Sequence, residues 1–390
     1  MPWKSAGARM DAAVQWKTGN RSQTGTKSGK AHSAGRGCVL VTGATGSLGG
    51  ALIERILADS DMDVLALVRE SGRESAEMRL HAAIDFEQIP GEARGRIGSI
   101  PGDIRRAPWR GDTSLHNMLR TRVTEIFHLA ASTDLTGTRE SLMAANVDGT
   151  QAMLTLAQDL HSNGRLERFN HFSTAFIAGS AQDHHAMEVY PCPQPAWANA
   201  YEESKHIAEG NVHAAIAGGL PATVFRPSIV VGNSDDGYTR SFGLFYHIVR
   251  KIKRSGIRRL PGEESDRIQI VPLDFVCNAA LEISRRTDST GGIFHLVSDN
   301  APDFATLLRV GAEEMEWARG LSLIPVERFS PAARSVLQSA FVFLNYFHRD
   351  LDFDTTNTRE ALRGSGIAMP DTDAEYIRRI LHYACAMDYL

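Results

Sequence analysis

The chain has 390 residues, of which 43% are hydrophobic, and its formal net charge is -4 at pH 7. This apolar content builds the core of an ordinary globular protein, and the charge balance gives no reason to expect nucleic acid as a partner. The four cysteines, at positions 38, 192, 277 and 385, lack metal-ligand or framework spacing. Their scatter argues against a disulfide scaffold and favours a reducing, cytoplasmic location.

Residues 1–36 differ in composition from the rest of the chain. They hold seven Lys or Arg against one acid, Asp11, are rich in Gly, Ser and Thr, and show no hydrophobic period. We expect a disordered basic tail there, with a mitochondrial presequence as the alternative on composition alone. The most apolar late run, residues 336–347, falls short of the about 20 residues that span a bilayer, so we expect no membrane span.

From residue 38 onward, short apolar runs alternate with longer amphipathic stretches. Stretches such as 48–58 and 141–161 carry apolar residues at spacings of three and four, which is typical of helices. Five runs are too short for helices and predict buried parallel strands: 38–42, 64–68, 125–130, 169–174 and 222–226. The alternation predicts an α/β fold, a doubly wound parallel sheet of the Rossmann type.

The regular alternation ends after residue 232, which suggests a division into domains. We expect the cofactor-binding Rossmann domain to span 37–232, and residues 233–265 and 299–390 to form a smaller substrate-binding region. Two later strand-like runs, 268–271 and 293–297, return to the main domain within a segment at about 266–298.

Glycines at positions 43, 46 and 49 follow the first predicted strand and open a helix. Gly43 permits a tight turn, Gly46 lets the backbone approach a pyrophosphate, and Gly49 allows close packing of helix against strand. The helix N-terminus then faces the anion with its N–H groups and its dipole. The loop predicts a dinucleotide site to which four neighbours also contribute: Thr42, Thr45, Ser47 and Leu48.

Arg69 follows the second predicted strand, where NAD-selective folds place an acid that binds the ribose 2′-hydroxyl. An arginine at this position, with Arg73 near it, attracts a 2′-phosphate instead. The expected cofactor is therefore NADP(H), and NAD(H) is the alternative.

Tyr201 and Lys205 lie four residues apart, on one face of a helix that we expect to start near Ala200. The lysine ammonium, together with the positive ring of an oxidised cofactor, would lower the phenol pKa and make Tyr201 an acid–base catalyst. Thr174 ends a strand at the carboxyl edge of the sheet, where ligands of such sheets bind, and Ser173 is its nearest rival for binding the substrate oxygen.

The sequence Asp-His-His at 183–185 lacks a third ligand at a recognisable spacing, so no metal site is expected. This segment either borders the substrate or is a polar surface loop.

These motifs, in this order, resemble the extended short-chain dehydrogenase/reductase superfamily over most of residues 38–300. Four further segments carry the resemblance: GDI at 102–104, HLAA at 128–131, NVDGT at 146–150 and RPSIVVG at 226–232. The resemblance implies that Thr174, Tyr201 and Lys205 are the catalytic residues. It also implies that Tyr201 and Lys205 contact the cofactor. A larger group is implied to contact it as well: Asp103, Ile104, Leu129, Ala130, Ala131, Asn146, Ser173, Pro227, Ser228 and Ile229.

Within the superfamily, the sequence is similar to the thioester reductase and fatty acyl-CoA reductase branch. The similarity rests on ALVR at 66–69, HFSTAF at 171–176 and the 226–232 segment followed by Ser234. That branch reduces an acyl thioester on coenzyme A or a carrier protein to an aldehyde, and sometimes on to the alcohol. The resemblance implies NADPH-dependent hydride transfer to a thioester or aldehyde carbonyl, a small or thioester-linked acyl substrate, and an acyl carrier protein acting in trans. A homodimer is one candidate for the oligomeric state.

Other functions share the same motifs. The alternatives are a ketone or hydroxysteroid-type dehydrogenase and a sugar-nucleotide epimerase or dehydratase; a dehydratase needs an added acid–base pair where this chain has Ala175 and Phe176. A non-catalytic NADP-binding sensor typically loses the Tyr or the Lys, and both are present. Four late apolar residues line an acyl or aromatic pocket or belong to the core: Phe341, Phe343, Leu344 and Tyr346.

Overall fold

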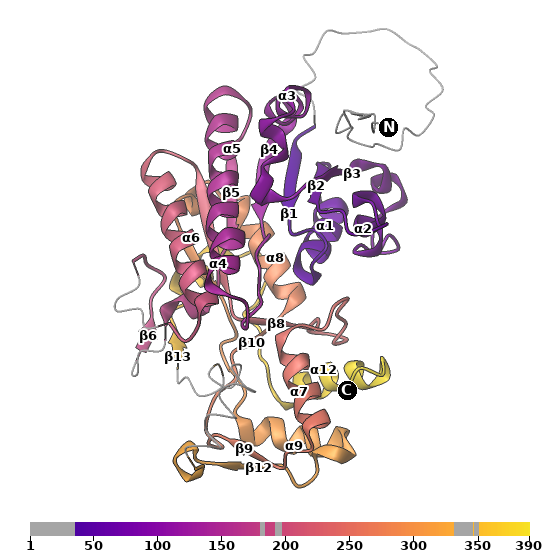
Figure 1. Cartoon of the computed structure of the whole chain (residues 1–390), viewed down its shortest axis with the longest axis vertical. Coiled ribbons are helices and arrows are strands. Elements are labelled where there is room, and N and C mark those ends of the chain that lie inside the picture. Colours follow the sequence, from indigo (N-terminus) through magenta and orange to yellow (C-terminus); the bar gives the residue numbers. More distant parts are fainter. Residues whose placement is uncertain (1–35, 180–183, 192–196, 331–345, 347–350) are drawn as a thin grey trace, which may run out of the picture.

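The computed structural model describes residues 36–179, 184–191, 197–330, 346 and 351–390. The basic tail up to residue 35, Asp183 and the three residues Phe341, Phe343 and Leu344 lie outside this part of the chain. The described residues form two lobes, a sheet domain with helices on both faces and a smaller, mainly helical lobe (Figure 1).

The sheet domain is built on seven parallel strands in the order β11-β7-β5-β4-β1-β2-β3. The strands are β1 Cys38–Thr42, β2 Asp63–Val68, β3 Ile97–Pro101, β4 Val123–His128, β5 Arg168–Phe172, β7 Ala222–Pro227 and β11 Ile293–Leu296. Their side chains are mostly buried on both faces, as expected for a parallel sheet covered by helices. The predicted doubly wound α/β fold is confirmed.

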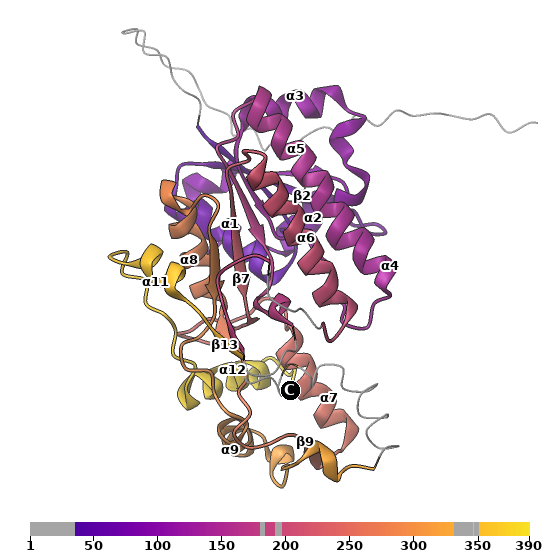
Figure 2. The ribbon, with the colours of Figure 1, turned by 90° about the vertical axis from the view of Figure 1, so that its left-hand side faces the viewer.

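Two layers of helices cover the sheet (Figure 2). One face carries α1 Ser47–Asp59, α2 Ala76–Ala82, α8 Leu273–Ser284 and α11 Thr356–Leu362. The opposite face carries α3 Thr113–Arg122, α5 Gly149–Asn163 and α6 Ala200–Ala217. α4 Arg139–Leu142 leads into α5 through a π-helical turn, Met143–Asp148.

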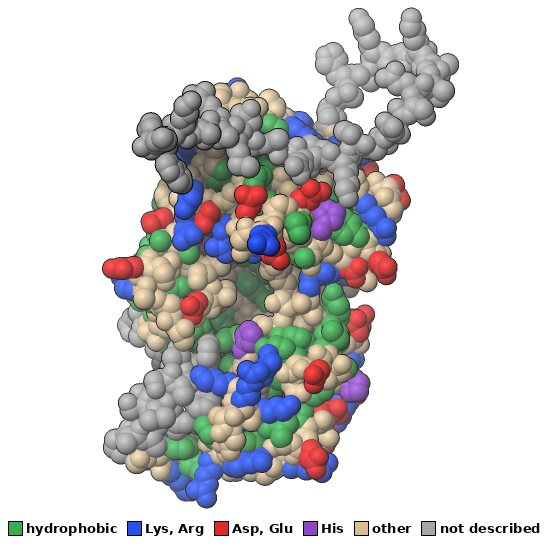
Figure 3. Space-filling model, turned by 45° about the vertical axis from the view of Figure 1, so that its right-hand side comes forward, with side chains coloured by type: hydrophobic (Ala, Val, Ile, Leu, Met, Phe, Trp, Pro, Cys, Tyr) green, Lys and Arg blue, Asp and Glu red, His purple; other side chains and the backbone are tan. Residues whose placement is uncertain are grey.

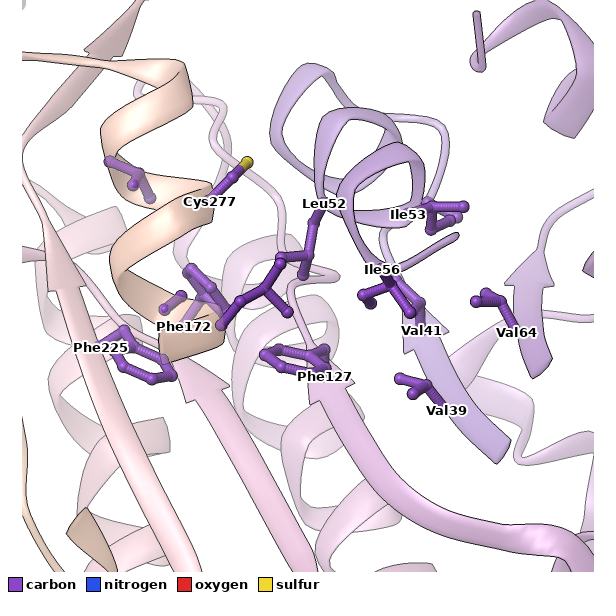
Figure 4. Packing of buried hydrophobic residues seen from close by; sticks show 14 of the residues in the cluster. Val39, Val41, Leu52, Ile53, Ile56, Val64, Phe127, Phe172, Phe225 and Cys277 are labelled. Carbon is purple, nitrogen blue, oxygen red and sulfur yellow. The ribbon is translucent and has the colours of Figure 1, made fainter. Parts of the chain in front are cut away.

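The core under α1 and α8 holds the cofactor edge of the sheet in place (Figure 4). Leu52 and Ile56, one turn apart on α1, point toward the sheet; Ile56 lies over Val41 of β1, and Cys277 of α8 belongs to the same cluster. They pack with Phe127 of β4 and Phe225 of β7, all at most 2% exposed. This packing fixes the start of α1 at the carboxyl ends of the central strands.

The smaller lobe has its own core. Its elements are α7 Leu244–Ser255, β9 Arg259–Pro261, α9 Phe304–Glu314, β12 Ser322–Ile324 and α12 Ala374–Ala386. The short pairs β8 Ile229–Val231 with β10 Ile270–Pro272, and β6 His184–Ala186 with β13 Leu351–Phe353, lie between the lobes (Figure 1). A second apolar cluster runs through α7, α9 and α12 up to Phe176 and Tyr201.

Three local features differ from expectation. β3 was not among the predicted strands, because Gly98 and Ser99 dilute its apolar pattern. The run 293–297 joins the main sheet as β11, but the run 268–271 continues into β10, which pairs with β8 outside that sheet. The predicted helix 141–161 contains the π-helical turn.

The division into domains stays a prediction. Its proposed substrate region contains α11, which packs against α8 and β11 of the sheet domain. Within the described residues, no helix is both long and apolar enough to cross a membrane.

Candidate active site

The glycine loop after β1 is packed so closely that it leaves no room for a side chain at Gly43 or Gly49. Gly43 has a φ of 77°, and a Cβ there would lie 2.8 Å from the backbone nitrogen of Ala130. A Cβ on Gly49 would lie 2.2 Å from the carbonyl oxygen of Gly43. The first turn of α1 carries no acid, and no side chain caps its N-terminus at Gly46. The loop therefore fits the pyrophosphate of a dinucleotide.

A buried chain of hydrogen bonds fixes the neighbouring segment after β4. The Ala130 N–H donates to Thr42 Oγ1 at 3.2 Å, and that hydroxyl lies 2.8 Å from His128 Nδ1. Burial lowers the pKa of His128 to about 3, so the ring is neutral. The neutral ring carries one N–H, so it donates to one of its two hydroxyl neighbours and accepts from the other: Thr42 at Nδ1 and Thr150, 3.1 Å from Nε2. Sequence reasoning assigned no role to His128 or Thr150.

Arg69 and Asp103 lie at the outer end of the carboxyl edge, after β2 and β3. The Arg69 side chain is exposed, and its carbonyl oxygen accepts a hydrogen bond from the Arg79 guanidinium. Asp103 accepts from the Arg105 backbone at 2.9 Å and from its guanidinium at 2.6 Å, and this partner holds the pKa of Asp103 below its usual range. Ile104 lies beneath, against Gly149 at the start of α5.

The helix α6 places Tyr201 and Lys205 on the same face, and it begins at Ala200 as predicted. Asn199 caps it by accepting from the Glu202 N–H at 3.0 Å. Tyr201 lies close enough to Thr174, which follows β5, for that hydroxyl to lower the pKa of the phenol. Lys205 Nζ donates to the Phe172 carbonyl at 2.6 Å. Thr174, Tyr201 and Lys205 are thus brought together at the carboxyl edge of the sheet.

Burial sets the protonation of these groups. It raises the pKa of Tyr201 to about 12, against the opposing effect of the Thr174 hydroxyl. It lowers the pKa of Lys205 to about 8. The expected lowering of the phenol pKa by Lys205 is not found in the protein alone, because the ammonium is directed at the Phe172 carbonyl and desolvation dominates. At neutral pH the phenol carries its proton, which is the form that a carbonyl reduction consumes.

Asn146 connects the catalytic helix to the cofactor edge. The π-helical turn carries it, and such turns are frequent at functional sites. Its Oδ1 accepts from the Ser132 N–H at 2.7 Å, and its Nδ2 donates to Ser204 Oγ at 2.9 Å. Ser204 in turn donates to the Tyr201 carbonyl at 2.7 Å. Sequence reasoning missed Ser204, although its place between Tyr201 and Lys205 was the available signal.

The segment after β7 forms the wall beside Thr174. The Pro227 carbonyl oxygen lies 3.4 Å from Thr174 Oγ1, and the Ile229 N–H donates to Gln269. Ser228 Oγ is buried and has no hydrogen-bond partner among the described residues, which leaves it available to a ligand. On the opposite side, the Ser173 N–H donates to the Phe225 carbonyl at 2.8 Å.

The described part of the 183–185 segment belongs to β6, which pairs with β13. His185 Nδ1 lies within hydrogen-bond distance of Asp352 Oδ2, at 2.8 Å. Within the described ranges, no three side chains of His, Cys, Asp or Glu are grouped so that they could hold a metal ion.

The sheet order and the glycine loop define the class of protein. The chain has the fold of the extended short-chain dehydrogenases/reductases, with an NAD-binding domain. Residues 41–280 match the profile of an NAD-binding family described as male sterility protein, and the chain belongs to that family. The superfamily resemblance noted in the sequence is confirmed.

Similar proteins include enzymes of peptide and lipid metabolism. Isonitrile lipopeptide synthase of Streptomyces coeruleorubidus is 26% identical over 368 residues, which cover 88% of this chain and 24% of that protein. Fatty acyl-CoA reductase wat of Drosophila melanogaster is 24% identical over 299 residues, which cover 67% of this chain and 57% of that protein. The chain thus spans less than two thirds of either relative.

Among solved structures, the terminal R domain from the myxalamid PKS-NRPS biosynthetic pathway has a TM-score of 0.77. It is 25% identical, and the match covers 92% of this chain and 93% of that domain. Both lobes therefore have counterparts in that R domain.

Proposed function

We propose that the protein uses NADPH to reduce an acyl thioester to an aldehyde. The observation that carries this proposal is the contact between a protonated Tyr201 and Thr174 at the carboxyl edge, on the border of an apolar cluster. The cofactor residues expected from the sequence, from the glycine loop to Ile229, are proposed to hold the dinucleotide. When bound, NADPH supplies the hydride.

The two hydroxyls suit the reaction. Thr174 and Tyr201 would bind the carbonyl oxygen and polarise it. As the carbonyl carbon accepts the hydride, Tyr201 gives its proton to the oxygen, and a hemithioacetal forms. The hemithioacetal loses its hydroxyl proton, the C–S bond breaks, and the sulfur leaves as a thiol. Solvent then returns the proton to Tyr201, while the Lys205 charge stabilises the phenolate.

The smaller lobe is proposed as the substrate-binding region. Tyr201 and Phe176 belong to the same apolar cluster as α7, α9 and α12. An apolar crevice in this lobe is lined by residues of α7, α9 and the segment after it, including Ile248, Leu307 and Trp317. This continuity supports an acyl group as the substrate. Ala175 and Phe176, both buried and apolar, leave no acid–base pair beside Thr174 for a sugar dehydratase.

A basic surface supports an acidic partner. No acid occurs between Asp236 and Glu263, and six cations lie within 250–259: Arg250, Lys251, Lys253, Arg254, Arg258 and Arg259. Figure 3 shows the surface hollowed between the lobes, with Lys and Arg side chains gathered on the smaller lobe below the hollow. We propose that an acyl carrier protein or the phosphates of coenzyme A dock here, in the cytoplasm.

The test is to follow NADPH absorbance with an acyl-CoA, an acyl-carrier thioester, an aldehyde and a ketone in parallel. Turnover of a thioester is expected, and Tyr201→Phe should reduce it by about 10²- to 10⁴-fold. Tyr389→Phe is the control, because it removes a hydroxyl that binds His247 instead. Oxidation of NADPH with ketones alone would refute the thioester assignment, and full turnover by Tyr201→Phe would refute the mechanism.

A further inference from the structure

A fully buried carboxylate lies on the catalytic helix beyond the residues of the proposed reaction. Glu209 follows Lys205 by four residues, and Lys205 follows Tyr201 by four, so the three share one face of α6. Glu209 is 0% exposed and Lys205 is 3% exposed. A buried acid needs a cationic partner, because burial alone would neutralise it.

Arg226 of β7 is that partner. Its Nη2 lies 2.6 Å from Glu209 Oε1, and its Nε donates to the same carboxylate at 3.1 Å. Two further donors of the guanidinium bind the carbonyls of Met187 and Val189, at 3.2 and 2.9 Å, in the segment that precedes α6. The pair therefore joins the catalytic helix to the strand that leads into the cofactor wall.

The other side of Arg226 faces a neutral ring. Its Nη1 donates to His295 Nε2 at 3.2 Å, so His295 Nδ1–H donates to the Asp354 carbonyl at 2.7 Å. Burial lowers the pKa of His295 to about 3, which keeps the ring uncharged. Glu188 lies between the two residues whose carbonyls Arg226 binds. It accepts from the His295 N–H at 2.7 Å and from Thr358 Oγ1 at 2.7 Å.

Among the described residues, Glu209, one helical turn from Lys205, is the anion whose charge acts on Lys205 through space rather than by direct contact. His128 of β4 and His171 of β5 are neutral, because burial lowers the pKa of each. On α6 itself, Glu202 binds the backbone at Ala198, while His213 lies 3.4 Å from Glu209. Burial depresses the pKa of Lys205, and Glu209 opposes that effect.

We infer that Glu209 is a positioning residue for the reaction: held by Arg226, its carboxylate is the counter-charge of the buried Lys205 ammonium. The inference rests on the proposed function, in which the Lys205 charge supports Tyr201. Glu209 touches neither substrate nor cofactor in this scheme. It acts by keeping Lys205 cationic over the pH range of the enzyme.

The sign of the pH effect follows from the charges. With the Lys205 pKa lowered to about 8, activity should fall as pH rises through that region and the ammonium loses its proton. Removing the Glu209 charge favours the neutral amine, so the fall should move to lower pH by about one unit. Removing Arg226 while keeping Glu209 leaves Lys205 as the remaining cation beside the carboxylate. The loss of activity at alkaline pH should then move to higher pH.

The experiment compares profiles of kcat/KM against pH. The main variant is Glu209→Gln, which keeps the size of the side chain and removes its charge, and the second variant is Arg226→Met, which removes the opposite charge. The Arg226→Met variant is expected to shift in the opposite direction. Glu188→Gln is the matched control, because it removes a buried carboxylate of the same network that does not act on Lys205, and its profile should match the wild type.

Cofactor affinity and thermal unfolding of each variant establish that it is folded. A folded Glu209→Gln variant that keeps the wild-type alkaline limb overturns the inference. If Glu209→Gln does not fold, Arg226→Met decides, and an unshifted or downward-shifted limb overturns the inference. Full turnover by Tyr201→Phe would instead refute the proposed function, so the two failures are distinguishable.

Discussion

At the level of single residues, burial assigns protons to the site before any ligand arrives. Tyr201 holds its proton up to a pKa of about 12, and Lys205 holds its proton up to about 8. A proton donor and a cation are what the reduction of a carbonyl requires. Oxidation of an alcohol would require the phenolate, which burial disfavours here. At neutral pH the site therefore holds the proton that the proposed reduction consumes.

Arg69 is the residue that we propose selects NADPH over NADH. Arg69→Glu should weaken NADPH binding by roughly 10- to 100-fold, because a charge-assisted bond to the 2′-phosphate is replaced by repulsion. NADH binding should improve, since a carboxylate accepts from the ribose 2′-hydroxyl. Titration of each nucleotide by fluorescence measures both affinities.

Arg73→Glu is the control for this change, because Arg73 is exposed in the next turn and does not end a strand. A smaller effect on NADPH is expected from it. Unchanged NADPH affinity in Arg69→Glu would mean that the arginine is only a solvated surface charge.

At the level of elements, the contact between Gly49 and the Gly43 carbonyl sets the distance of α1 from the loop. Gly49→Ala should cost about 1–3 kcal/mol, because a Cβ there would lie 2.2 Å from that oxygen and the helix must move away. Dinucleotide binding should weaken at the same time, since the N-terminus of α1 moves with the helix. Chemical denaturation and nucleotide titration measure the two effects.

The control is Gly91→Ala, where a Cβ would have no atom within 4 Å. It should leave stability and nucleotide affinity unchanged. If Gly49→Ala matched this control, the close packing of helix and loop would have no energetic weight.

Elements with a strong local pattern were predictable from the sequence. The five predicted strands formed because short apolar runs buried on both faces have few alternatives. β3 was missed because Gly98 and Ser99 weaken its pattern, and the π-helical turn was missed because one extra residue per turn hardly disturbs an apolar period.

The candidate site divides in the same way. Thr174, Tyr201 and Lys205 were found because each lies at a fixed place on a predicted element. The Glu209–Arg226 pair was not found, because a helix acid and a strand arginine become partners only when α6 and β7 pack together. Ser204 was missed for the same reason, since its role depends on Asn146 from another helix.

At the level of the whole molecule, two helices of the smaller lobe form hydrogen bonds with the chain where it leaves the sheet domain. Tyr246 of α7 accepts a hydrogen bond from the Gly232 N–H at 3.0 Å, and Tyr376 of α12 donates to the Gly232 carbonyl at 2.7 Å. A Cβ on Gly232 would lie 2.1 Å from the Gly237 carbonyl oxygen. The N–H and the carbonyl of Gly232 are thus both hydrogen-bonded to helices of the smaller lobe.

Tyr376→Phe should destabilise the protein by about 1–3 kcal/mol, because the buried Gly232 carbonyl loses its partner. The loss should also raise the KM for NADPH, since Gly232 ends the segment of the cofactor wall. Thermal unfolding and steady-state kinetics measure the two effects. Tyr383→Phe is the control, because the Tyr383 hydroxyl makes only a 3.4 Å contact with the Thr239 carbonyl. Equal losses of stability in both variants would show that the hydrogen bond from Tyr376 to Gly232 has no special weight.

The place of β11 at the edge of the sheet has a consequence for biosynthesis. β11 pairs with β7, yet the ribosome makes all of α7 and α8 between the two strands. Until residues 293–296 emerge, β7 is an open edge, and open edges pair with other chains. The sheet domain cannot finish folding before the first part of the smaller lobe has been synthesised. The nascent chain should therefore depend on chaperones most during that interval.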